Sequence, residues 1–227
     1  ANNNWKRPIY FSGGAYDDED FLWMKNYLQL DGMTYKLVPI KTEIAKDASP
    51  LEMGGIDTDK MYANVMKWDW GNSESLSIYH DPETRKNSIT YRSYLSRLMN
   101  QLILEGKKEK AKNIITLAMN KMPLEQFGYY SLLEPFAKGY YDLGENAKAQ
   151  DLLSKLILKY KENLKYYSSL TPSDQTSQAI DIITDIERYR SLLLVMKESG
   201  DVTFYNKNKA QFNTYVIIFE RFGREKE

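Results

Sequence analysis

The sequence predicts a mostly helical protein with a small N-terminal α+β part. Two observations indicate this class. Before about residue 90, glycine and proline separate short runs rich in aromatic and β-branched residues. From residue 91 onward, apolar residues recur with the three- and four-residue spacing of α-helices. We therefore expect an α+β head over residues 1–88 and an array of antiparallel helix pairs over residues 89–227.

A hairpin and a short helix are the clearest elements of the head. Asp31 and Gly32 stand between two β-prone runs, and an Asp-Gly pair in that position is typical of a tight hairpin turn. A helix is expected over residues 56–68, with Asp57 or Thr58 as its N-cap.

The chain begins abruptly with NNNWKRPIYFSGG. Trp5, Ile9 and Phe11 fall on one alternating face, which predicts a buried strand followed by a turn at Gly13 and Gly14. Because domains ordinarily begin with a few polar residues that fray, this start indicates that the chain is a piece of a longer protein.

Six helices are expected after the head. The first carries Leu95, Leu98 and Leu102 as one apolar stripe and ends at Gly106. The fifth begins at Thr171, which can cap it, with Pro172 in the first turn. The expected ranges are about 91–105, 111–122, 129–143, 149–160, 171–198 and 203–222.

The helices come in pairs that suggest an internal repeat. Aligning Gly106 with Gly144 superposes large apolar and small residues in the helices on either side: Leu98 on Phe136, Leu102 on Tyr140, Ala111 on Ala149, Ile115 on Leu153 and Ala118 on Leu156. This pattern resembles tetratricopeptide repeats, although Leu156 stands where alanine is usual. After Gly200, Tyr205 replaces the alanine, so that third pair is degenerate or capping. An ordinary helical bundle with coincidental glycine turns is the alternative.

Composition excludes several classes of function. Lys+Arg and Asp+Glu are both 31, so no basic field points to nucleic acid or to anionic lipid. The absence of cysteine excludes disulfides, thiol nucleophiles and cysteine-ligated zinc, and is compatible with the cytosol or with an envelope compartment. No run of 18 apolar residues and no signal-peptide pattern occurs in the chain.

The residues suited to catalysis are few. His80 is the single histidine, which excludes two-histidine metal motifs, and its place beside Asp81-Pro82 predicts a loop histidine without a partner. The acidic runs Asp17–Asp20 and Asp57–Asp59 have residue types that bind cations, but solvated helix starts and capping explain them better. We expect no catalytic residue, no metal site and no cofactor in this chain.

Two surfaces are candidates for binding. In KWDWGN, Trp68 and Trp70 flank Asp69, an arrangement that can stack on a sugar while the carboxylate accepts hydroxyl hydrogen bonds. The alternative, which we favour, is that both tryptophans staple the head onto the helices. The second surface is the concave face expected of a tetratricopeptide-like array, which would expose Ser96, Asn100, Glu134 and Lys138 to a peptide or protein partner.

Several segments carry a resemblance to a known family. They are NNWKRPIYFS, YLQLDGMTYKLVPIK, MYANVMKWDWGN and YHDPETRKNSITYR, followed by the helical repeats. In this order they resemble the C-terminal soluble region of a family of large Bacteroidetes-type membrane proteins, formerly of unknown function and similar to lipid-sugar-dependent protein O-mannosyltransferases. The resemblance implies a missing N-terminal multi-pass membrane part that carries the glycosyl transfer. No catalytic residue of that part has a counterpart here.

The resemblance therefore implies a non-catalytic, periplasmic accessory domain that presents acceptor polypeptide or a partner to its own membrane domain. Whether the parent is an enzyme stays open, and a glycosyltransferase resembling protein O-mannosyltransferases is the expectation. The alternative from a different class is a free-standing carbohydrate-binding protein that uses Trp68, Asp69 and Trp70, and a soluble enzyme is the third possibility. The acceptor, the donor sugar and the oligomeric state do not follow from the sequence.

Overall fold

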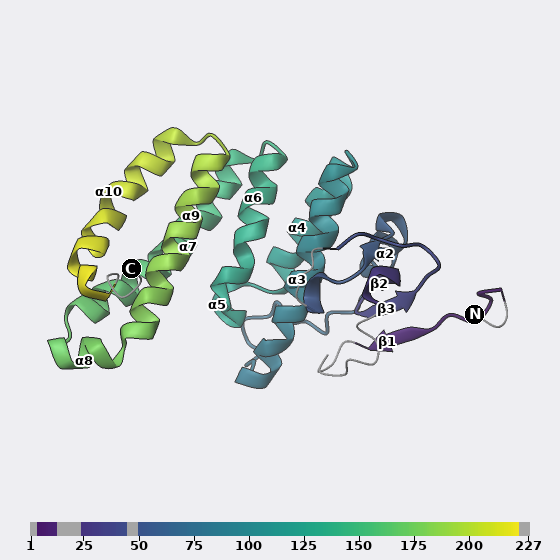
Figure 1. Ribbon diagram of the computed structural model, residues 1–227, viewed down its shortest axis with the longest axis horizontal. Helices are drawn as coiled ribbons and strands as arrows, with labels where there is room; N and C mark the ends of the chain where they lie inside the picture. The colour runs from purple at the N-terminus through teal and green to yellow at the C-terminus, as the bar shows by residue number, and fades with distance from the viewer. Residues whose placement is uncertain (1–3, 13–23, 45–49, 223–227) are drawn as a thin grey trace. The chain divides into compact units, whose positions relative to one another are not determined.

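A small mixed sheet and nine α-helices make up the residues that the structure, a computed structural model, describes: 4–12, 24–44 and 50–222 (Figure 1). The predicted class, mostly α with a small N-terminal β-containing part, is confirmed. The chain divides into two compact units, residues 1–132 and 133–227. The sheet and the first long helix pair both belong to the first unit, so the predicted division at residue 88 stays a proposal about sequence modules.

The sheet has the strand order β1-β3-β2-β4. Its strands are β1 (Tyr10–Ser12), β2 (Leu28–Asp31), β3 (Thr34–Leu37) and β4 (Gly55–Ile56). The predicted hairpin is confirmed: β2 and β3 pair antiparallel with Asp31 opposite Thr34, and Gly32 takes a φ of +69° in the turn. β1 pairs antiparallel with β3, and β4 pairs parallel with β2.

The prediction of a buried N-terminal strand was wrong. The strand covers only residues 10–12 and lies at the edge of the sheet, where it pairs with β3. Trp5 is 40% exposed and Ile9 is 47% exposed, while Phe11 is half-buried. An edge strand is covered less than a central one, so alternating aromatic residues do not by themselves establish burial.

The helices of the first unit begin at capped residues. In α2 (Thr58–Val65), the Asp57 carboxylate accepts the Lys60 backbone N–H, which confirms the predicted cap. The next helices are α3 (Pro82–Leu104), α4 (Lys108–Lys121) and the short α5 (Leu124–Phe127). α3 begins nine residues earlier than expected, because Asp81 accepts the backbone N–H groups of Glu83 and Thr84 and Pro82 occupies the first turn.

Arg97 attaches α3 to the sheet. Its guanidinium donates to the Tyr35 hydroxyl at 3.2 Å, to the Leu51 carbonyl at 2.9 Å and to the Gly54 carbonyl at 2.8 Å. Leu51 lies in the 3₁₀ turn η2 (Pro50–Glu52), and a second such turn, η1 (Lys25–Tyr27), precedes β2. The sheet is thereby held against the helix that also forms the first helix pair with α4.

The second unit is entirely helical over its described residues. It begins in the 3₁₀ turn η3 (Tyr130–Leu133) and continues with α6 (Glu134–Asp142), α7 (Asn146–Ser168), α8 (Pro172–Ser177), α9 (Ala179–Glu198), α10 (Val202–Ile218) and the 3₁₀ turn η4 (Glu220–Phe222). The third predicted helix therefore starts at residue 134 rather than 129. The fifth is interrupted at Gln178, and Thr171 caps its first segment as predicted by accepting the Asp174 N–H.

Three helix pairs turn at glycines of the same conformation. Gly106, Gly144 and Gly200 have φ values of +73°, +77° and +77°. In each, the glycine N–H and the next N–H bond back to carbonyls of the final helical turn, which is the Schellman arrangement that favours glycine. These turns join α3 to α4, α6 to α7 and α9 to α10. The tetratricopeptide resemblance itself stays a prediction.

No helix in the described part of the chain is both long enough and apolar enough to cross a bilayer.

Candidate ligand-binding site

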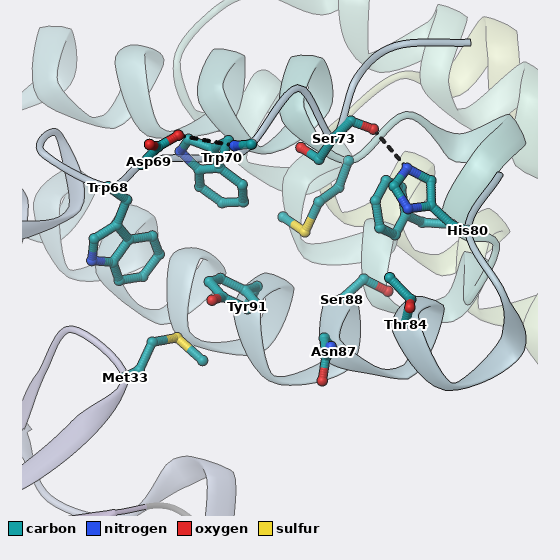
Figure 2. A pocket seen from close by; sticks show the side chains of 13 residues that line it. Met33, Trp68, Asp69, Trp70, Ser73, His80, Thr84, Asn87, Ser88 and Tyr91 are labelled. Atoms are coloured by element: carbon teal, nitrogen blue, oxygen red, sulfur yellow. Dashed lines mark hydrogen bonds between the residues drawn. The ribbon is translucent and has the colours of Figure 1, made fainter. Parts of the chain in front are cut away.

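The first two turns of α3 place a polar and aromatic stripe on one face of the helix. Thr84, Asn87, Ser88 and Tyr91 follow the spacing i, i+3, i+4, i+7, so they line one wall of a pocket together (Figure 2). The cap at Asp81 fixes where the helix begins and hence which way this stripe faces. The spacing was visible in the sequence, but it lay before the residue at which the helix was expected to start.

Two tryptophans from the loop after α2 cover Tyr91. The ring centroid of Trp68 lies 5.4 Å from that of Tyr91 at 90°, and Trp70 lies 5.5 Å from Tyr91. The two indoles are 5.7 Å apart, and both are half-buried. Asp69 between them is exposed and accepts the Gly71 backbone N–H at 3.0 Å. The tryptophans thus pack on α3, as stapling requires, and still present part of their surface to a ligand, as sugar binding requires.

His80 closes the other end of the pocket. Its Nε2 lies 2.9 Å from the Ser73 carbonyl oxygen, so this nitrogen carries the proton and donates it (Figure 2). The imidazole is buried and packs on Phe127, with ring centroids 4.5 Å apart. His80 lies in a loop as predicted, but the expectation that it has no partner was wrong, because its ring bonds to the Ser73 carbonyl and Arg85 donates to its backbone carbonyl.

The floor of the pocket depends on a buried arginine. Arg92 is fully buried, and its guanidinium donates to the Met122 carbonyl at 2.9 Å and to the Gly128 carbonyl at 2.5 Å. These two bonds hold both ends of the segment that supplies Met122 and Phe127 to the pocket. Burial lowers the pKa of the Arg92 guanidinium to about 10. Sequence reasoning missed this residue, although it lies on the apolar stripe that continues through Leu95.

The resulting pocket has a volume of about 370 Å³. Its lining combines aromatic rings with hydroxyl and amide groups, and Asp69 contributes the one carboxylate among the lining residues. Met33, from the turn of the β2–β3 hairpin, completes it near Trp68 (Figure 2). Volumes of this size and linings of this kind suit small or extended uncharged ligands, which bind by stacking and by a few directed hydrogen bonds.

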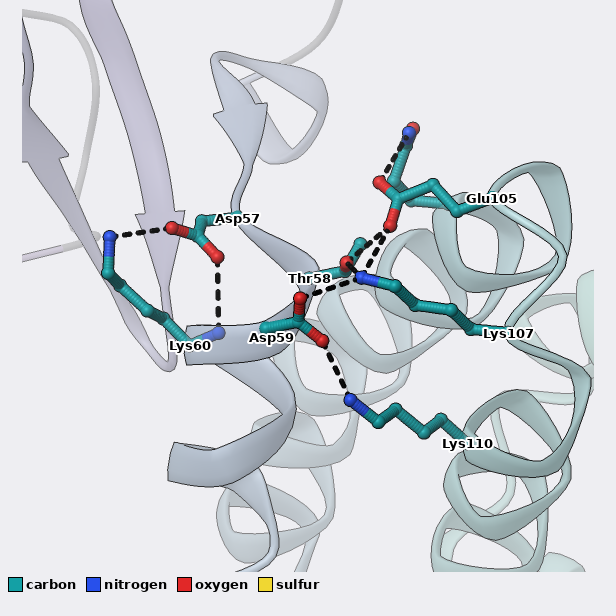
Figure 3. Close-up of polar contacts among 8 residues, drawn as sticks. Asp57, Thr58, Asp59, Lys60, Glu105, Lys107 and Lys110 are labelled. Carbon is teal, nitrogen blue, oxygen red and sulfur yellow. Dashed lines mark hydrogen bonds and ion pairs between the residues drawn. The ribbon is translucent and has the colours of Figure 1, made fainter.

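The Asp57-Thr58-Asp59 triplet at the start of α2 is a structural link (Figure 3). The two carboxylate oxygens of Asp59 accept from Lys107 Nζ at 2.9 Å and from Lys110 Nζ at 2.7 Å. The hydrogen bonds from Lys110 and Lys107 lower the pKa of Asp59 to about 2. Thr58 Oγ1 donates to Glu105 at 2.5 Å, so the triplet ties α2 to the α3–α4 turn. Both carboxylate oxygens of Asp59 therefore already accept from lysines, which disfavours the alternative that this segment binds a cation.

The other acidic groups in the described part of the chain form no metal site. Asp17–Asp20 lie outside the described residues. Within residues 4–12, 24–44 and 50–222, no group of three histidine, aspartate or glutamate side chains is arranged to hold a metal ion.

The four residues predicted for a concave binding face have different environments. Ser96 is buried on α3 and donates to the Ser93 carbonyl at 2.9 Å, so its predicted exposure was wrong; α3 is covered on more than one side and buries this position. Asn100 is exposed on the same helix. On α6, Glu134 accepts the Ser191 hydroxyl at 2.7 Å, and the exposed Lys138 pairs with Asp142 at 2.8 Å.

Comparison with known proteins gives one match. The family described as TMEM260-associated domain 2 matches residues 1–60, which contain the sheet and the start of α2. This segment is thus similar to a domain associated with TMEM260-type membrane proteins, in partial agreement with the resemblance to a membrane-protein family. No curated protein and no solved structure matches the chain.

Proposed function

We propose that the chain is a non-catalytic accessory domain of a multi-pass, glycosyltransferase-like membrane protein. In this proposal it binds an acceptor polypeptide or a partner on the periplasmic side of the membrane and presents it to the membrane part. The similarity of residues 1–60 to a membrane-protein-associated domain supports the link to such a protein. The pocket beside Trp70 is the observation that carries the binding role.

The pocket offers an extended polypeptide two kinds of interaction. Trp68 and Trp70 provide half-exposed aromatic surface on which proline rings or aliphatic side chains can pack. Asn87 is exposed on α3 and carries an amide that both donates and accepts, as pairing with a peptide backbone requires. Because these contacts are local and largely uncharged, binding should be weak and should depend little on salt.

The test is a fluorescence titration of the full chain with a short, unstructured peptide rich in serine, threonine and proline. We expect a saturable change in tryptophan emission that Trp70→Ala weakens by about tenfold, in line with the loss of one stacking contact. Trp5→Ala is the matched control, since Trp5 lies in the same compact unit, is 40% exposed and does not line the pocket. Equal affinities for the wild type and Trp70→Ala would exclude the pocket as the acceptor site.

Carbohydrate binding at the same pocket is the second candidate function. It is favoured by Asp69, which lies between the two tryptophans in the sequence, is exposed and lines the pocket, so that its carboxylate is suited to accept sugar hydroxyls. Titration with a neutral linear trisaccharide under the same conditions distinguishes the two functions. Trp70-dependent binding of the trisaccharide without binding of the peptide would favour the carbohydrate-binding function.

A concave face on the helical array remains a separate proposal for where the polypeptide binds. In that case binding depends on Asn100, Glu134 and Lys138 and weakens as salt screens the two charges. Lys138→Ala would then reduce peptide affinity, while Trp70→Ala would leave it unchanged.

A further inference from the structure

The seam between α9 and α10 contains two neighbouring hollows. Their volumes are about 300 and 250 Å³, and Arg190 lines both of them. Ile183 and Phe219 share one hollow, whereas Lys197 and Tyr205 share the other, so the two helices run antiparallel and the hollows follow one another along their seam, which we call the groove. The whole groove lies in the second compact unit.

The residues that line the groove repeat with the period of a coiled-coil seam. Alternating steps of three and four residues keep one face of a helix turned toward a neighbour along its length. On α9 the lining residues at this spacing are Ile183, Ile186, Arg190, Leu193 and Lys197. On and directly after α10 they are Tyr205, Lys209, Phe212, Val216 and Phe219.

The apolar side chains on the floor of the groove are buried, whereas those at its rim are partly exposed to solvent. Phe212 and Leu193 are buried between the two helices, and Phe212 packs on Tyr189 with ring centroids 5.2 Å apart. In contrast, Leu194 is 50% exposed and Ile183 is 41% exposed at the edge of the groove. A helix pair with a filled floor and apolar side chains left at its rim has the shape that receives a third amphipathic helix.

The two ends of the groove carry opposite charges. Lys197 and Lys209 line one end, where no acidic side chain lines the hollow, and Lys209 Nζ lies 5.4 Å from the centroid of the Tyr205 ring. Glu187 and Glu220 line the other end. Arg190 lies between the ends, 3.5 Å from Glu187. In a chain with equal numbers of acidic and basic residues, this separation is a local feature that a partner can recognise.

We propose that this groove binds an amphipathic α-helix of a partner protein, with acidic residues in its first turn over Lys197 and Lys209 and basic residues in its last turn over Glu187 and Glu220. The residues from Ile183 to Lys197 span about 21 Å of α9, which corresponds to about four helical turns of the partner. Acids at the N-terminus and bases at the C-terminus also stabilise the partner's own helix, so the bound helix runs antiparallel to α9. The inference adds a second surface to the interaction role proposed above and rests on that role.

The test compares two synthetic peptides of about 18 residues, the length needed to span the groove with one flanking turn. Both have leucines at alternating three- and four-residue steps. The first has glutamates in its first turn and lysines in its last, and the second has these charges exchanged. Fluorescence anisotropy of the labelled peptides against the full chain should show about tenfold tighter binding of the first peptide. Lys197→Glu and Lys209→Glu together make both ends of the groove acidic, so this double variant should remove the preference between the two peptides.

Leu194→Glu tests the apolar rim and should abolish binding of both peptides. Its matched control is Leu158→Glu on α7, because Leu158 is 49% exposed and lines neither hollow. Circular dichroism of both variants establishes that the helices are intact. Equal affinity for the two peptides, or binding that survives Leu194→Glu, would overturn the proposal.

Two further outcomes bear on the occupant. If neither peptide binds and sedimentation shows a dimer that Leu194→Glu dissociates, the groove belongs to a second copy of the chain and the proposal is wrong. If neither peptide binds and the chain is monomeric, the proposal is also wrong. Failure of the acceptor-binding function would appear separately, as peptide binding that does not depend on Trp70, because that pocket lies in the other compact unit.

Discussion

Replacing Arg92 with methionine should destabilise the first unit and weaken ligand binding together. Methionine keeps an unbranched apolar stem but is shorter and has no donor, which leaves the buried Met122 carbonyl and the part-buried Gly128 carbonyl without this partner. Each unsatisfied acceptor costs about 1–3 kcal/mol, and relief from burying the cation offsets part of the total. We therefore expect the free energy of unfolding to fall by about 3 kcal/mol.

Denaturant unfolding followed by tryptophan emission measures this decrease in the free energy of unfolding for the first unit specifically. The chain's four tryptophans all precede residue 133, so their emission reports on the first compact unit. Arg188→Met is the matched control, since Arg188 is exposed on α9 in the second unit and its loss should leave the emission transition unchanged. Arg92→Lys keeps the charge but supplies one compact donor group, and its stability should fall between the wild type and Arg92→Met.

The same variant tests whether Arg92 positions the pocket floor. Met122 and Phe127 line the pocket, and the Arg92 bonds fix the chain on both sides of Phe127. Binding at the pocket should therefore weaken in Arg92→Met under conditions in which the variant is fully folded. A loss of stability below about 1 kcal/mol would mean that other groups replace the missing donors, and the reasoning would be refuted.

Three further substitutions test other features of the fold. Gly144→Ala should lower stability by about 1 kcal/mol, measured by thermal melting, because the space around the glycine is open and only the positive φ resists the change. Asp59 has a folded-state pKa of about 2 against 3.8, so its contribution is complete above that ordinary value and is lost as the pH falls toward 2. Asp59→Asn, which removes the pairs with Lys107 and Lys110, should flatten this acid limb of an unfolding profile. Asp201→Ala should cost about 1–2 kcal/mol by calorimetry, because it removes the cap of α10 and the acceptor of the Tyr141 and Gln150 side chains.

Each of these has an outcome that contradicts it. If Gly144→Ala has the same melting temperature as the wild type, the turn must relax to a negative φ. An acid limb unchanged by Asp59→Asn would assign the acid sensitivity to other carboxylates. For Asp201, Asp151→Ala is the control, since Asp151 is exposed and forms an i,i+4 pair with Lys155 on the helix surface. Equal melting of the two aspartate variants would mean that the cap does not stabilise α10.

Local rules account for the features that the sequence predicted well. The Asp31-Gly32 turn, the caps at Asp57 and Thr171 and the glycine at each helix–helix turn are all determined by a few neighbouring residues. The period of the apolar residues likewise indicated α4 with small errors at its ends, whereas α7 continues to Ser168, well beyond the predicted end at residue 160. Such signals require no knowledge of the tertiary structure.

The predictions that failed concern features that depend on tertiary contacts. Burial of β1 depends on its position in the sheet, which alternation along WKRPIYFS does not reveal. The early start of α3 was readable from Asp81 and Pro82, but that pair also suits a turn, and the ambiguity concealed the anchoring of His80. Arg92 was overlooked because a cation on an apolar stripe is expected to reach solvent, whereas here backbone carbonyls surround it.

The candidate site was only half visible in the sequence. Trp68, Asp69 and Trp70 were identified as a binding loop from their residue types. Tyr91, on which both indoles pack, could be connected with them only once the loop was placed against α3. The two interpretations of the loop, stapling and ligand stacking, proved physically compatible, since each tryptophan buries part of its surface and presents the rest.

The position of α3 has a consequence for how this protein can diverge. One face of the helix contacts α4, Arg97 reaches the sheet and the stripe from Thr84 to Tyr91 faces the pocket, so few positions are surrounded only by solvent. Most positions of α3 should consequently tolerate substitution poorly. The usual alternation between a tolerant exposed face and an intolerant buried face should be weak. Thr84 and Asn87, which line the pocket without belonging to the core, are the positions where ligand preference can drift at little cost to folding.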